Sequence, residues 1–167
     1  MLGLEKGALH IVPYDEAWPA EFAAEVVRIW PLLAPFARDI QHIGSTAVPG
    51  LAAKPILDIA VAVTSAGAVA ACTPALVALG YTDRGQTDEQ GHYYFVRDNP
   101  RTHQVHVSQV PNLGWDARLL FRDRLRSDPA LAAEYAALKQ RLAAEFKSDK
   151  LAYCDAKTAF VRAASLP

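Results

Sequence analysis

The fold is decided by the stretch His42-Ile43-Gly44-Ser45-Thr46-Ala47-Val48-Pro49-Gly50-Leu51-Ala52-Ala53-Lys54-Pro55-Ile56-Leu57-Asp58-Ile59-Ala60-Val61-Ala62-Val63. This stretch predicts a short strand, a Gly-Ser turn, a tight loop and a second strand. Residues 56–63 are apolar except for Asp58, which is the pattern of a strand covered on both faces. Because an isolated buried charge is costly, the Asp58 carboxylate needs a cation, an ionic partner or a proton. This carboxylate is the first indication of a functional site.

The composition is that of an ordinary globular chain. The 167 residues are 51% hydrophobic and 21% charged with a formal net charge of −1, so the chain lacks the positive charge that binds nucleic-acid polymers or membranes. No apolar run approaches the roughly 20 residues that cross a bilayer. Cys72 and Cys154 lie outside any His-Cys cluster, which is typical of reduced packing residues. We expect one cytoplasmic domain over residues 1–167.

Helix and strand patterns flank the central stretch on both sides. We expect helices over residues 16–37, 66–79, 115–125, 129–146 and 156–164. We expect strands over residues 39–43, 56–63, 91–96 and 102–110, and a short strand or turn over 81–87. The segments 91–96 and 102–110 should form a hairpin around the turn at 97–101. The sequence therefore predicts an α/β domain with a mostly C-terminal helical layer.

The central stretch resembles the signature of one protein family. Residues 42–50 followed by 54–59 are similar to the signature of the GrpB family, and the likeness extends over nearly the whole chain through Tyr14, Trp18, Phe22, Phe121-Arg122-Asp123, Tyr135, Lys139, Tyr153, Lys157 and Phe160. The resemblance implies the α+β fold of the nucleotidyltransferase superfamily, a small mixed sheet flanked by helices. The biochemical role of the family is poorly defined, and a related domain is fused to dephospho-coenzyme A kinase in some bacteria.

The resemblance to nucleotidyltransferases gives the Gly-Ser turn a role. In that superfamily a Gly-Ser pair ends one strand, and acidic residues on the next strands hold divalent metal. Gly44 and Ser45 match the first feature and Asp58 the second. A glycine lets the backbone approach a phosphate closely, and a hydroxyl with exposed N–H groups can bind it. The alternative is that Gly44 and Ser45 only form a turn that ends a strand.

The acidic set of the superfamily is incomplete in this chain. Its Asp-x-Asp pattern would place a second carboxylate two residues after Asp58, where the chain has Ala60. The segment 102–110 contains no acidic residue that could serve as the third. A two-metal mechanism needs several carboxylates around the ions. The sequence therefore argues against standard nucleotidyl transfer.

The strand at 102–110 offers histidine instead of an acid. Gln104, His106 and Ser108 share one face of a regular strand, whereas His103 points to the opposite face. We expect the face with His106 to lie towards Asp58, with His106 as a metal ligand or proton-transfer group. The alternative is a histidine satisfied by a backbone carbonyl. His42 and His92 are weaker candidates, more typical of packing or rim residues.

Cationic residues complete a predicted anion site. Lys54 lies in the loop before Asp58, and Lys157 lies in the Tyr-x-x-x-Lys-x-x-Phe segment from Tyr153 to Phe160. A ridge along one helix face, roughly 12 Å long, comprises Arg118, Arg122 and Arg126. Arginine suits bidentate phosphate contact. The alternatives are a solvated Lys54 and a surface ridge paired with neighbouring aspartates.

These patterns predict a nucleotidyltransferase-fold protein that binds a small phosphate-containing ligand, a nucleotide or a coenzyme. Asp58 with His106 would hold one divalent cation, Mg²⁺, Mn²⁺ or Zn²⁺, and the expected reaction, if there is one, is nucleotidyl or phosphoryl transfer. A rival hypothesis is a non-catalytic accessory domain that binds a ligand or a protein partner. A third is a His-Asp metal hydrolase. The sequence leaves substrate, metal, turnover and oligomeric state open.

Overall fold

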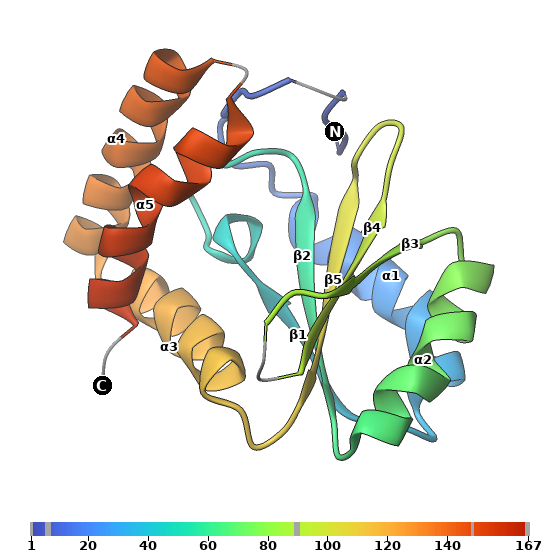
Figure 1. The fold of residues 1–167 in the computed structure, drawn as a ribbon. Helices are drawn as coiled ribbons and strands as arrows, with labels where there is room; N and C mark the ends of the chain where they lie inside the picture. The colour runs from blue at the N-terminus through green and yellow to red at the C-terminus, as the bar shows by residue number, and fades with distance from the viewer. Residues whose placement is uncertain (1, 6–7, 89–90, 148, 166–167) are drawn as a thin grey trace.

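The computed structural model describes residues 2–5, 8–88, 91–147 and 149–165, and shows helices flanking a mixed sheet (Figure 1). The helices are α1 (Trp18–Leu33), α2 (Ala66–Ala78), α3 (Leu113–Ser127), α4 (Pro129–Phe146) and α5 (Lys150–Ala164), with a short 3-10 helix η1 (Ser45–Ala47). The strands are β1 (Ala37–Ile43), β2 (Leu57–Val63), β3 (Thr82–Gln86), β4 (His92–Arg97) and β5 (His103–Gln109). The predicted α+β architecture with a C-terminal helical layer is confirmed.

The sheet has the strand order β1-β2-β5-β4-β3. The pair β2 and β5 is parallel, and the other neighbouring pairs are antiparallel. Every residue of β2 from Ile59 onwards is buried, as predicted for a strand covered on both faces. The predicted hairpin is confirmed, because β4 pairs antiparallel with β5. This topology brings β2 beside β5, although about forty residues separate the two strands in the chain.

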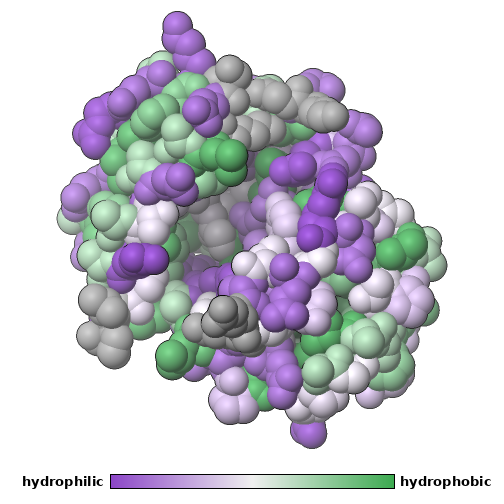
Figure 2. Space-filling model, in the orientation of Figure 1, coloured by the Kyte–Doolittle hydropathy of each residue, from purple (hydrophilic) through white to green (hydrophobic). Residues whose placement is uncertain are grey.

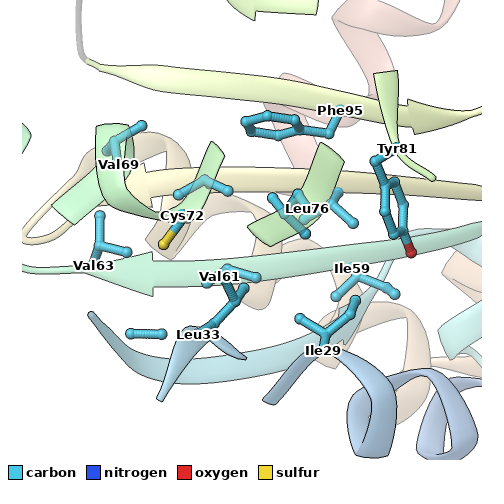
Figure 3. Packing of buried hydrophobic residues seen from close by; sticks show 13 residues of the cluster. Ile29, Leu33, Ile59, Val61, Val63, Val69, Cys72, Leu76, Tyr81 and Phe95 are labelled. Atoms are coloured by element: carbon cyan, nitrogen blue, oxygen red, sulfur yellow. The ribbon is translucent and has the colours of Figure 1, made fainter. Parts of the chain in front are cut away.

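Side chains of β2 alternate between two different surroundings, as the pleat of a strand requires. Ile59, Val61 and Val63 belong to the main core, where they pack with residues of α1 and α2, as Figure 3 shows. Ala60 and Ala62 lie on the other face in a smaller cluster with Trp115 of α3. By the same alternation Asp58 belongs to the α3 side. The sheet therefore presents its one acidic β2 residue away from the main core.

The C-terminal helical layer is longer than the sequence predicted. Helix α5 begins at Lys150, whereas the sequence predicted a short helix over residues 156–164. The Asp149 carboxylate accepts a 3.0 Å hydrogen bond from the backbone N–H of Ala152, which fixes this earlier start. Asp128 caps α4 in the same way. None of the helices in the described ranges combines the length and hydrophobicity needed to cross a bilayer.

Candidate functional site

The corner between β1 and η1 is built around a glycine. Gly44 has φ +70°, and a Cβ atom at this position would lie 3.0 Å from Asp58 Cβ and closer still to its carboxylate. Only glycine therefore allows this backbone to pass so close to the aspartate. The strand register explains the proximity, because Ile43 pairs with Asp58. The predicted Gly-Ser corner thus lies directly against the predicted acid.

Asp58 and His106 face each other across the parallel pair β2 and β5. Asp58 lies opposite Gln104, and Ala60 lies opposite His106, so these side chains share one face of the sheet. The His106 Nε2 atom is 3.6 Å from Asp58 Oδ1. The Asp58 side chain is 27% exposed and lines a cavity with Gln104 and His106. The structure therefore brings together the aspartate and histidine that the sequence placed on facing strands.

His92 on β4 extends this pair into a chain of polar groups. Its Nε2 atom is 2.9 Å from His106 Nδ1, and its Nδ1 atom is 2.6 Å from Thr87 Oγ1. The guanidinium of Arg118 lies against the same ring, with Nη2 3.2 Å from Nδ1. Burial, the charge of Arg118 and the nearby His106 lower the pKa of His92 to about 4, so this imidazole is neutral at pH 7.

The direction of this chain depends on which ring nitrogens carry protons. Arg118 Nη2, which can only donate, lies 3.2 and 3.3 Å from the two nitrogens of His92, so the neutral ring offers it one lone pair and keeps its proton on the other nitrogen. When the His106 proton lies on Nδ1, the lone pair at Nε2 faces the Asp58 carboxylate. Two acceptors 3.6 Å apart are suited to receive a hydroxyl donor or a cation between them.

The other two buried histidines, His42 and His103, pack against neighbouring side chains outside the cavity. His42 stacks on Phe22 at 4.6 Å between ring centroids and hydrogen-bonds Thr46 Oγ1 at 3.0 Å. Burial lowers its pKa to about 4. His103 points to the opposite face of β5, as predicted, where it lies 3.3 Å from an Arg97 nitrogen. Neither histidine lines the cavity that contains Asp58.

Three lysines from distant parts of the chain form the opposite wall of this cavity. We call Lys54, Lys139 and Lys157 the lysine cluster. Lys54 and Lys157 lie 4.9 and 4.6 Å from the ring centroid of Tyr153, and Lys139 lies 4.7 Å from that of Tyr135. Within the described ranges no carboxylate forms an ion pair with any of the three ammonium groups. The cluster is therefore held by aromatic faces without neutralising acids.

The pKa values of two members of the lysine cluster are lowered by burial and by the neighbouring positive charges. Lys139 is 2% exposed, and burial together with the charges of Lys157 and Lys54 lowers its pKa to about 7. Burial and the charge of Lys54 also lower the pKa of Lys157, while Asp58 acts in the opposite direction. The ammonium of Lys139 donates to the carbonyl oxygen of Ala52, which holds it in place. An anion in the cavity would offset the repulsion among the lysines, which is the second cause of the shift after burial.

Two tyrosines connect the lysine cluster to the Gly-Ser corner. Burial raises the pKa of Tyr135 and the neighbouring Ser45 side chain opposes that rise, while Lys139 lies over the Tyr135 ring. Tyr153 is fully buried, and among the described residues its hydroxyl has no hydrogen-bond partner. Both tyrosines line the cavity. A buried hydroxyl without a partner is costly, and this one belongs to a residue that lines the cavity.

The cavity has a volume of about 810 Å³ and lies between the sheet and the C-terminal helices. Figure 2 shows this side of the molecule hollowed, with hydrophilic side chains gathered along the sheet edge of the hollow. Most of the predicted site residues line it, namely Gly44, Ser45, Lys54, Asp58, His106, Arg118 and Lys157. The geometry therefore joins the predicted acid, imidazole and Gly-Ser corner to cations in one cleft.

The predicted arginine ridge is wrong beyond its first member. Arg118 lines the cavity, but Arg122 is buried and donates to Gln41 Oε1 at 2.9 Å and to the carbonyl oxygen of His42 at 3.0 Å. It also contacts the Asp123 carboxylate at 2.7 Å. Arg126 donates to the carbonyl oxygen of Ala47 at 2.9 Å. These two arginines fasten α3 to the β1 corner and do not face the cavity.

The protein donors do not form a metal site of the two-metal type. In the described part of the chain, no group of three or more His, Cys, Asp or Glu side chains is placed to hold a metal ion. On the strand side of the cavity, Asp58 and His106 are accompanied by Gln104 and by Asp88, whose carboxylate lies 3.5 Å from His92 Nδ1. A two-metal site for phosphoryl transfer requires several carboxylates. The residues present therefore do not fit that set.

Three important residues of the cleft, Lys139, Tyr135 and Tyr153, were absent from the predicted site. Tyr135 lies in the helix predicted over residues 129–146 and packs against Phe121, with 5.2 Å between ring centroids. The signal that could have found Lys139 is its place within the resemblance, one turn after Tyr135 in an otherwise apolar row. A lysine in that row is expected to be either extended to solvent or functional.

Comparison with known proteins identifies relatives of similar sequence. A family model described as GrpB protein matches residues 8–165. UPF0157 protein YqkA of Bacillus subtilis is 38% identical over 160 residues, which cover 95% of this chain and 47% of the relative. Glutamate-rich protein GrpB of Alkalihalophilus pseudofirmus is 32% identical over 167 residues, with 96% of each chain covered. A dephospho-CoA kinase of Mycolicibacterium paratuberculosis is 29% identical over 185 residues, covering 95% of this chain and 46% of the kinase. The chain thus spans about half the length of YqkA and of the kinase.

Two solved structures place the fold. The crystal structure of conserved protein GrpB from Enterococcus faecalis has a TM-score of 0.87 and 33% identity, covering 93% of this chain and 94% of that chain. Cid1, an RNA terminal uridylyl transferase, has a TM-score of 0.55 and 19% identity, covering 80% of this chain and 43% of Cid1. The second likeness shows the fold alone, which is the predicted nucleotidyltransferase-like fold. With the family model and the Enterococcus structure in agreement, the chain belongs to the GrpB family.

Proposed function

We propose that the cleft binds a small phosphate-bearing molecule, a nucleotide or a coenzyme. The observation that carries this proposal is the lysine cluster, in which three ammonium groups line one cavity without an acidic partner among the described residues. Like charges held together in a partly buried site repel each other, so the arrangement is unfavourable until an anion enters. Phosphate groups supply that charge and several acceptor oxygens.

The position of the phosphates follows from the donors around the cavity. Lys54 and Lys157 approach the same Tyr153 ring, Lys139 approaches the Tyr135 ring, and Ser45 lines the same cavity. Phosphate oxygens between the Gly-Ser corner and α5 would meet all these donors. The cavity volume of about 810 Å³ falls within the range of small-molecule sites. The fold shared with Cid1 supports a nucleotide, and the relatives among dephospho-CoA kinases support a coenzyme.

The reaction best suited to the Asp58–His106 pair on the strands is transfer of a nucleotidyl or phosphoryl group. An acceptor hydroxyl between Asp58 and His106 would donate its proton to this pair while its oxygen bonds to phosphorus. The bond from phosphorus to the departing phosphate oxygen would break, and the released phosphate or diphosphate would stay with the lysine cluster. A second candidate is a non-catalytic binding domain, which is favoured by Ala60 in the position of the second acid. Both candidates require ligand binding, and they differ only in turnover. Binding is therefore the first property to test.

A thermal-shift panel of nucleotides and coenzyme A precursors tests the proposal. A ligand present at about 100 times its Kd should stabilise the protein by roughly 2.7 kcal/mol. Lys157→Met should reduce this stabilisation, whereas Arg141→Met, which removes an exposed cation from α4, should leave it unchanged. The absence of any shift with the whole panel, in the presence and absence of Mg²⁺, would refute the proposed function.

A further inference from the structure

The charge balance of the cleft differs from that of a metal-dependent phosphate site. Enzymes that bind linked phosphates usually neutralise them with Mg²⁺, which is itself held by one or more carboxylates and by the phosphate oxygens. Among the described residues, Asp58 is the carboxylate that contacts the His106 ring, and the next residue on that face of β2 is Ala60. A second carboxylate, Asp88, also lines the cavity, but it lies 3.5 Å from His92 Nδ1 and acts on the charge of Arg118. Arg118 and the three lysines outnumber these two carboxylates, which leaves little net negative charge to hold a resident cation.

A permanent cation already lies beside the Asp58–His106 pair. The guanidinium of Arg118 lies against the His92 ring, which in turn contacts His106 at 2.9 Å. Among the described residues, Arg118 Nη1 is buried and has no hydrogen-bond partner. This nitrogen is a free donor at the sheet end of the cavity. A divalent ion placed next to it would be repelled, whereas a phosphate oxygen would satisfy it.

The lysine cluster supplies the positive charge at the other end of the cavity. Its three ammonium groups come from the loop before β2, from α4 and from α5. The nearest ring centroids are 4.6 to 4.9 Å away, within cation–π range, but an aromatic face carries no net charge and therefore does not neutralise the lysines. The number of unpaired donors exceeds what a single phosphate needs and matches a chain of linked phosphates.

We infer that the ligand carries two or more linked phosphates and binds as the free anion, its charge balanced by the lysine cluster and Arg118 rather than by a divalent cation. This inference rests on the proposed function and gives it a more specific ligand class. It also assigns Asp58 an unusual effect on binding. Without a bridging metal, the Asp58 carboxylate repels the bound phosphates.

Isothermal titration calorimetry with inorganic phosphate, pyrophosphate and tripolyphosphate tests the inference. In buffer containing EDTA, pyrophosphate should bind about tenfold or more tightly than phosphate, because additional charge-assisted hydrogen bonds form. Excess Mg²⁺ should weaken pyrophosphate binding, since the metal competes with the lysines for the same oxygens. Lys54→Met and Lys157→Met should each weaken binding about tenfold, and Arg141→Met serves as the control with the same loss of charge.

The variant Asp58→Asn should change the affinity for pyrophosphate in opposite directions, depending on whether the anion binds without metal or through a bridging metal. If the anion binds without metal, removal of the carboxylate charge tightens pyrophosphate binding about three- to tenfold in EDTA. If a metal bridges Asp58 and the phosphates, the variant loses binding, and the wild type binds only with Mg²⁺ or Mn²⁺. That outcome overturns the inference and leaves the proposed function standing. Failure of every probe under both conditions overturns both. Thermal melting confirms that each variant is folded.

Discussion

Replacement of Lys139 by methionine should change how the stability of the protein depends on pH. Burial and the charges of Lys157 and Lys54 lower the pKa of Lys139 from 10.5 to about 7. Between these two values the unfolded chain holds a proton that the folded protein lacks, so the free energy of unfolding rises with pH. Below pH 7 Lys139 is protonated in both the folded and the unfolded states, and the folded state then carries the full unfavourable free energy of a buried charged lysine. Methionine cannot ionise, so the variant lacks this contribution.

The size of the effect follows from the pKa difference. A shift from 10.5 to about 7 corresponds to about 5 kcal/mol of unfavourable free energy when Lys139 is charged. The side chain is 2% exposed, so solvent screens it little. From about pH 6.5 to about pH 9, the wild type should gain about 2 to 3 kcal/mol of stability relative to Lys139→Met. Urea denaturation followed by circular dichroism at several pH values measures this difference directly.

A matched control separates the Lys139 contribution from general effects of charge. Arg141 lies on the exposed side of the same helix, and Arg141→Met removes the same formal charge from α4. Its stability should follow the pH dependence of the wild type. Parallel curves for the wild type and Lys139→Met would show instead that Lys139 titrates as an ordinary lysine. The lysine cluster would then not be a desolvated group of repelling charges.

Three further changes test individual contacts. Gly44→Ala should lower the free energy of unfolding in urea by about 2 kcal/mol or more, because a Cβ meets the Asp58 side chain; Gly50→Ala, with open space at the same sign of φ, should cost less. Tyr153→Phe should raise the melting stability by about 1 to 2 kcal/mol in the unliganded protein, since it removes an unpartnered buried hydroxyl, and a decrease would contradict that assignment. Glu25→Ala should lower the free energy of unfolding by about 3 to 5 kcal/mol, because it leaves Arg97 without the carboxylate that it contacts at 2.6 Å. A loss below about 1 kcal/mol would show that the ion pair contributes little.

Local rules were sufficient to predict the sheet wall of the site. The alternation of side chains along a strand placed Gln104 and His106 on one face, and the buried run around Asp58 indicated a central strand. Once β2 and β5 pair in parallel, these two facts bring Asp58 and His106 within 3.6 Å. The Gly-Ser corner could also be predicted, because a glycine followed by a residue with a hydroxyl group is typical of a turn that ends a strand.

Helical periodicity failed at the arginines for a geometric reason. Residues four apart on an α-helix are rotated by about 40° from each other, so Arg126 points about 80° away from Arg118. That rotation carries Arg122 and Arg126 from the cavity to the backbone carbonyls of His42 and Ala47. Spacing tells which residues share a face approximately. It does not tell where a neighbouring element covers that face, which here decides the role of each arginine.

Lys54 and Lys157 were predicted, but no local pattern could show that they meet Lys139, because the three lysines come from segments up to about one hundred residues apart. Their meeting depends on how α4 and α5 pack over the β1–β2 loop, where Lys139 binds Ala52 and Lys157 shares the Tyr153 ring with Lys54. Such a cluster lowers the stability of the free protein, and a purely structural layer would be more stable with neutral residues. The repulsion that Lys139→Met removes is the same repulsion that a bound anion would relieve. Stability in the free state and affinity for phosphate should therefore change in opposite directions across variants of these lysines.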